Sequence, residues 1–67
     1  MQLSARNQLR GTVREIKRGS VMAEVTVDLG GQEVVSVITV SSVDRLRLAP
    51  GDAVTVIVKS TEVMLGK

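Results

Sequence analysis

Hydrophobic and polar residues alternate along much of this chain with the period of a β-strand. The alternation is clearest from Ser20 to Leu29, where Val, Ala and Leu occupy every second position and Met, Glu, Thr and Asp occupy most of the others. A period of two predicts a strand with one buried face. Gly30 and Gly31 follow, and both can adopt the positive φ angles of a tight hairpin. We therefore expect residues 32–40 to form the second strand of this hairpin.

That second strand is apolar on both of its faces. Its apolar residues occupy odd and even positions alike: Val34, Val35, Val37 and Ile38. A strand that is apolar on both faces is typical of a strand covered from two sides. The pattern predicts that one face lines the interior of a barrel and that the other contacts a second subunit.

The remaining strands are predicted on either side of this hairpin. Residues 9–16 are expected to form the first strand, with Gly11 at a bend or bulge. The segment Ala49-Pro50-Gly51-Asp52 places Pro and Gly where a type II turn favours them, and residues 53–60 then alternate again. Residues 61–65 can form a short fifth strand.

A short helix is predicted between the third and fourth strands. Ser41 or Ser42 can cap it, with Ser41 better placed, and Asp44 then falls in its first turn. Five strands with this helix give the connectivity of an OB fold. The predicted fold class is therefore all-β, an OB-like barrel with one short helix, in a single domain over residues 1–67.

Composition narrows the possible functions. A domain of 67 residues buries only roughly 60% of the surface that its unfolded chain exposes. The chain has no Cys for disulfides and no His or Cys for a usual zinc site. Oligomerisation is therefore the expected source of extra stability. The net charge is +2 and the chain has no Phe, Tyr or Trp, which argues against a nucleic-acid-binding OB surface. No stretch has the pattern of a signal segment or a membrane span, so we expect a cytoplasmic protein without a membrane role.

Hydrogen-bond donors gather in three segments without any carboxylate. These segments are Ser4-Ala5-Arg6, Thr39-Val40-Ser41-Ser42 and Lys59-Ser60-Thr61. Guanidinium, ammonium and hydroxyl groups suit an oxyanion and not a hard cation, so no direct metal ligands are expected. Catalysis is not expected either, because no His or carboxylate accompanies the hydroxyls, and adjacent strand residues such as Lys59 and Ser60 point to opposite faces.

The order of these segments resembles that of the molbindins, the small molybdenum-pterin-binding proteins. Three stretches carry the resemblance, which covers nearly the whole chain: Ser4-Ala5-Arg6-Asn7-Gln8-Leu9-Arg10-Gly11, Ile38-Thr39-Val40-Ser41-Ser42-Val43 and Val58-Lys59-Ser60-Thr61-Glu62-Val63-Met64. The resemblance implies binding of intact molybdate, and of tungstate, for intracellular molybdenum storage, with no catalytic cofactor. It also implies a homohexamer, a trimer of dimers, that holds anions between subunits.

The resemblance further implies which residues hold the oxyanion. They are Ser4, Ala5, Arg6, Thr39, Ser42, Lys59 and Ser60. In the family, the hydroxyls at the positions of Thr39 and Ser42 reach the anion from a neighbouring subunit, while Asn7 and Gln8 are expected to hold the first loop. Two other kinds of ligand remain open: a pterin or another oxyanion, and nucleic acid on an OB-type surface.

Overall fold

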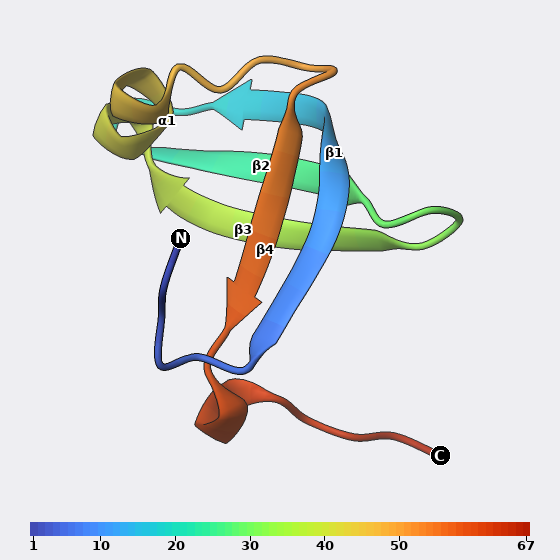
Figure 1. Ribbon diagram of the computed structural model, residues 1–67. Helices are drawn as coiled ribbons and strands as arrows, with labels where there is room; N and C mark the ends of the chain where they lie inside the picture. Colours follow the sequence, from blue (N-terminus) through green and yellow to red (C-terminus); the bar gives the residue numbers. More distant parts are fainter.

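A curled antiparallel sheet forms the body of the molecule, and a short helix lies at one end of it (Figure 1). The computed structural model describes residues 1–67. The strands are β1 (Asn7–Arg18), β2 (Met22–Asp28), β3 (Glu33–Thr39) and β4 (Ala53–Val58), followed by the 3₁₀ turn η1 (Ser60–Glu62). The helix α1 spans Val40–Leu46, between β3 and β4. The strand order is β3-β2-β1-β4, with each neighbouring pair antiparallel.

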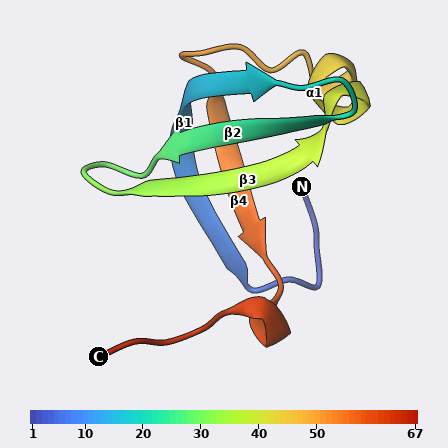
Figure 2. The ribbon, with the colours of Figure 1, turned by 180° about the vertical axis from the view of Figure 1, so that it is seen from behind.

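The OB-like fold class and the place of the helix are confirmed, but the prediction of a fifth strand over residues 61–65 is wrong. After β4 the chain makes η1 and then runs away from the sheet as an extended tail, which both views of the ribbon show (Figure 1, Figure 2). All residues from Lys59 to Lys67 are exposed. Because no fifth strand joins them, β3 and β4 each pair on one side only and the barrel stays open between them.

The hairpin of β2 and β3 forms as the alternation predicts. Ala23, Val25 and Val27 of β2 are buried, and Gly30 and Gly31 take φ angles of 90° and 106° between the strands. The Asp28 side chain accepts hydrogen bonds from the N–H groups of both glycines, at 2.8 and 3.2 Å. These two bonds favour the ionised carboxylate and lower the pKa of Asp28 below its ordinary value.

The buried core is small. It consists of five residues, none larger than Val: Val13, Ala23, Val25, Val27 and Val43. On β3 the inward residues are half-buried, while Val35 and Val37 on its other face are 57% and 61% exposed. A single chain therefore leaves much of its apolar surface in contact with water.

The bulge in β1 does not lie at Gly11. The pairing of β1 with β2 shifts register between Val13 and Glu15, so the prediction of a bulge at Gly11, the alternative to a bend, is wrong. Glycine is required at position 11 for a different reason, which is close approach of β2. A Cβ atom there would lie 2.5 Å from Cγ1 of Val27 and 2.8 Å from the carbonyl oxygen of Asp28.

Helix α1 is capped by Thr39, and the prediction of Ser41 or Ser42 as the cap is wrong. Thr39 has extended backbone angles, φ −71° and ψ 149°, and its hydroxyl accepts the N–H of Ser42, whereas both serines lie inside the first helical turn. Asp44 is consequently not in the first turn but further along α1, where it pairs with Arg18 at 2.5 Å. The turn before β4 agrees with the prediction, since Gly51 has a φ of 95°.

Candidate oxyanion-binding site

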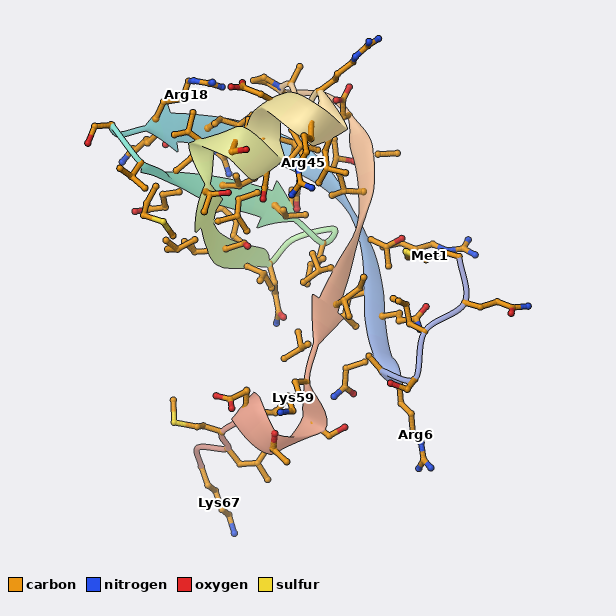
Figure 3. All side chains as sticks on the ribbon, turned by 90° about the vertical axis from the view of Figure 1, so that its left-hand side faces the viewer. Met1, Arg6, Arg18, Arg45, Lys59 and Lys67 are labelled. Carbon is orange, nitrogen blue, oxygen red and sulfur yellow. The ribbon has the colours of Figure 1, made fainter.

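Pairing of β1 with β4 brings the first and third donor segments together. Asn7 at the start of β1 lies opposite Val58 at the end of β4, so Arg6 and Lys59 occupy the next positions outward at the same end of the sheet. Figure 3 shows both side chains at this end, far from the helix and pointing in different directions. Both residues are exposed. Strand pairing alone therefore places two segments that are distant in the sequence at the same end of the sheet.

Neither of these two cations has an acidic partner. The ion pairs of the chain are Arg14–Glu33, Lys17–Glu15 and Arg18–Asp44, and all of them lie on other parts of the surface. The positive charges of Arg6 and Lys59 are therefore not neutralised within the chain. Two unpaired cations at the same end of the sheet provide a favourable local potential for an anion.

Three backbone N–H groups near the two cations donate no backbone hydrogen bond within the chain. The Gln8 side chain donates to the carbonyl of Ala5 at 2.7 Å, which confirms its expected role in holding the first loop. In η1 the carbonyl oxygens of Lys59 and Ser60 accept the N–H groups that come three residues later, at 2.9 and 3.5 Å. The N–H groups of Ala5, Arg6 and Ser60 make no backbone hydrogen bond, so they can donate to a ligand.

The second donor segment lies at the opposite end of the molecule, beside α1. The Thr39 hydroxyl donates to the Ser42 hydroxyl at 2.8 Å and accepts the Ser42 N–H at 3.0 Å. Arg45, one helical turn after Ser42, donates to the same hydroxyl oxygen at 3.3 Å. Because the Ser42 oxygen already accepts two bonds, its own proton is available to an outside acceptor.

Arg45 lies at this end of the molecule but is not among the site residues expected from the sequence. In the structure its guanidinium contacts Ser42, which is one of those residues. Figure 3 shows its side chain extending from the helix on the inner side of the molecule. The only sequence signal for this contact is the spacing of three residues between Ser42 and Arg45 within a predicted helix.

The predicted site residues therefore form two groups that one chain holds apart. One group lies at the end of the sheet away from α1, where Figure 3 shows Arg6 and Lys59, and it also contains the neighbouring residues Ser4, Ala5 and Ser60. The other group, Thr39 and Ser42, lies at the start of α1. The resemblance places Thr39 and Ser42 on a neighbouring subunit, and this separation is the arrangement such a shared site requires. The assignment of all seven residues to an anion stays a prediction.

Two further findings concern metal-ligand clusters and membrane-spanning helices. No group of three or more His, Cys, Asp and Glu side chains comes together in a way that could hold a metal ion. The helical segments are also far too short to include one that could span a bilayer. The predicted site residues at the two ends of the molecule carry guanidinium, ammonium and hydroxyl groups and no carboxylate, and such donors suit an anion.

The family model of the TOBE domain matches residues 3–65. Molybdenum-pterin-binding protein 2 of Clostridium pasteurianum is 46% identical to the chain over 66 residues, which cover 97% of each sequence. The chain belongs to the molbindins. A probable molybdenum-pterin-binding protein of Haemophilus influenzae is 45% identical to this molbindin over 67 residues, with 98% and 97% of the two sequences covered.

Solved structures give the same family. This molbindin superimposes on the molybdate-binding protein from Sporomusa ovata with a TM-score of 0.95, at 49% identity and full coverage of both chains. It superimposes on MopII from Clostridium pasteurianum with a TM-score of 0.92, at 43% identity, covering 98% of this chain and all of the other. The four-stranded half-barrel with an extended tail is therefore a chain fold that these related structures share.

Proposed function

We propose that this molbindin binds molybdate, and also tungstate, as the intact tetrahedral oxyanion, and that it serves as a cytoplasmic store of molybdenum. The observation that carries the proposal is the pairing of β1 with β4, which places Arg6 and Lys59 at the same end of the sheet without an acidic partner. The close structural relative from Sporomusa ovata is a molybdate-binding protein. The related ModG is described as cytoplasmic, which supports the location.

The donors present can supply the affinity that a store needs. Micromolar binding corresponds to about −8 kcal/mol. Charge-assisted hydrogen bonds contribute roughly 1.5–3 kcal/mol each, so a handful from Arg6, Lys59 and the free N–H groups reaches this value after ordering costs. The planar fork of Arg6 can contact two oxygens of the anion at once.

Selectivity against phosphate follows from the absence of a carboxylate among these groups. Near neutral pH phosphate carries a proton that needs an acceptor, whereas the charged groups of the site, Arg6 and Lys59, are donors only. Molybdate is a dianion without such a proton. Sulfate is also fully ionised, so its rejection depends on a cavity sized for the longer bonds of the larger ion.

We propose that the complete site forms between copies of the chain in a homohexamer, a trimer of dimers. The two ends of one chain carry different parts of the predicted donor set, so a single anion can meet both parts only where two chains adjoin. Binding at such a junction stabilises the assembled state by mass action. The protein makes and breaks no bond of its ligand.

A pterin is a second candidate ligand, because the relatives from Clostridium and Haemophilus are molybdenum-pterin-binding proteins by name. A pterin ring usually stacks on an aromatic side chain, however, and this chain has none. The inorganic anion therefore agrees better with the residues present.

Calorimetric titration with sodium molybdate tests the proposal. We expect saturable heat with micromolar or tighter Kd for molybdate and tungstate, and none for phosphate. The variants Arg6→Ala and Lys59→Met should lose most of the binding. The matched control Arg14→Gln should keep it, because Arg14 pairs with Glu33 elsewhere on the surface. Absence of saturable heat with either metal oxyanion would exclude the function.

A further inference from the structure

Three arginines lie around helix α1, and their side chains have different partners. Arg18 of β1 pairs with Asp44 at 2.5 Å, which neutralises the one carboxylate of the helix. Arg47, at the end of the helix, makes no ion pair. Arg45 makes no ion pair either, and its guanidinium donates to the hydroxyl oxygen of Ser42 at 3.3 Å, on the inner side of α1 and away from Arg18 (Figure 3). Arg45 is therefore the arginine of this group whose charge is directed at a predicted ligand residue.

The hydroxyls of Thr39 and Ser42 share one hydrogen bond but have two protons. Their oxygens lie 2.8 Å apart, and the Thr39 oxygen also accepts the N–H of Ser42 at 3.0 Å. Because a hydroxyl can rotate, this pair by itself allows either residue to be the donor. One proton is then left for an outside acceptor, and the pair by itself does not decide which residue provides it.

Arg45 removes this ambiguity in the direction of the bond. A guanidinium donates and does not accept, so the Ser42 oxygen is the acceptor of the contact with Arg45. A hydrogen bond from a cation polarises the hydroxyl, which makes Ser42 a stronger donor than Thr39. The stronger donor is matched with the stronger acceptor, which is an anion and not the neutral Thr39 oxygen. Thr39 then donates to Ser42, and the Ser42 proton is free for the anion.

The contact with Arg45 also holds the Ser42 side chain in place. Inside a helix, a serine hydroxyl can turn back and donate to the carbonyl group four residues earlier, which uses up its proton. In this structure the Ser42 oxygen is instead bound by Thr39 and Arg45, which lie three residues before and three residues after it. The hydroxyl is therefore pre-organised for a ligand, which lowers the cost of ordering it on binding.

We propose that Arg45 is a positioning residue of the oxyanion site, a role that rests on the function proposed above. Arg45 fixes the Ser42 hydroxyl and directs its proton to the anion, without contacting the anion itself. Its charge contributes as well as its hydrogen bond, because a cation polarises the hydroxyl more strongly than a neutral donor does. The Arg45 side chain is exposed and donates only to Ser42, so its replacement should leave the fold intact.

Molybdate titration of matched variants tests this role. Arg45→Met keeps the helix propensity of the residue but removes its donors, and it should raise the Kd about fivefold, as expected for the loss of one hydrogen bond. Arg45→Lys keeps a charged donor and should retain most of the affinity. The control Arg47→Met removes the same charge at the end of the helix and should titrate like the parent. An unchanged Kd for Arg45→Met would overturn the proposal, and so would an equal loss for Arg47→Met, which would indicate a general effect of charge.

A double-mutant cycle shows whether Arg45 acts through Ser42. In a chain that already carries Ser42→Ala, the further change Arg45→Met should leave the Kd as it is, because the hydroxyl that Arg45 positions is gone. The same loss with and without Ser42→Ala would overturn the proposal, since Arg45 would then act on the anion independently of Ser42.

Two further readouts separate this role from a structural one and from the proposed function. Without molybdate, Arg45→Met should keep the Tm and the light-scattering mass of the parent, and a fall in either would assign Arg45 to folding or assembly and overturn the proposal. Failure of the parent itself to bind molybdate would overturn the proposed function together with this inference. Binding by the parent that Arg45→Met does not weaken would overturn this inference alone.

Discussion

Thr39 and Ser42 are hydrogen-bonded to each other, but only the side chain of Thr39 caps helix α1. Substituting each residue separately therefore distinguishes helix capping from ligand binding. Thr39→Val keeps the shape of the side chain but removes the oxygen that accepts the Ser42 N–H at 3.0 Å. Loss of an N-cap residue costs about 1 kcal/mol of stability. In a domain of this size that corresponds to a fall of about 4–8 °C in Tm.

Ser42→Ala should behave differently. The N–H of residue 42 still donates to the Thr39 hydroxyl, so the cap survives and Tm should change little. The substitution removes the hydroxyl proton that the structure leaves available for an anion. Loss of one such donor costs on the order of 1 kcal/mol of binding free energy, or several-fold in Kd.

The assay compares thermal unfolding without ligand and molybdate titration for both variants at one protein concentration, since assembly makes Tm depend on concentration. Thr39→Ser is the control, because it keeps the hydroxyl and should retain most of both stability and affinity. Two results would refute the reasoning: a fall in Tm for Ser42→Ala as large as that for Thr39→Val, or unchanged affinity for Ser42→Ala.

Three further predictions concern other parts of the chain. Gly11→Ala should cost about 1–3 kcal/mol, because its Cβ would lie 2.8 Å from the carbonyl oxygen of Asp28, while Gly66→Ala, with nothing within 4 Å, should be neutral in chemical denaturation. The pKa of Asp28 is lowered in the folded state, so its contribution to stability is present above its ordinary pKa and is lost as the pH falls through the folded value. The free energy of unfolding of the parent should therefore exceed that of Asp28→Asn by less as the pH is lowered. A difference that does not change with pH would contradict this. Arg6→Lys should bind molybdate much more weakly than the parent because an ammonium lacks the planar fork, whereas Arg10→Lys, exposed on β1, should titrate like the parent.

The strands of the hairpin could be predicted because their pattern is local. Alternation from Ser20 to Leu29 and the two glycines after it suffice to define β2, the turn and β3. The fifth strand could not be predicted in the same way, since residues 61–65 have a strand-like pattern but a strand forms only beside a partner. The helix cap was misplaced because Thr39, Ser41 and Ser42 all carry hydroxyls, and only the backbone angles of Thr39 decide which one accepts the N–H.

The candidate site was named from a resemblance, and its arrangement depends on contacts that sequence patterns do not contain. The closeness of Arg6 and Lys59 follows from the register of β1 against β4, which pairs Asn7 with Val58. The position of Thr39 and Ser42 at the other end follows from the length of β3 and the start of α1. Arg45 was overlooked because its contact with Ser42 depends on where the helix begins.

Native mass spectrometry with and without molybdate tests the central claim most directly. The account predicts an assembly several times the chain mass of 7.2 kDa that gains whole molybdate ions, and no such gain for an assembled Arg6→Ala variant. Retention of molybdate by a folded monomer, or by an assembled variant that lacks both Arg6 and Lys59, would contradict an oxyanion site built from these residues between copies of the chain.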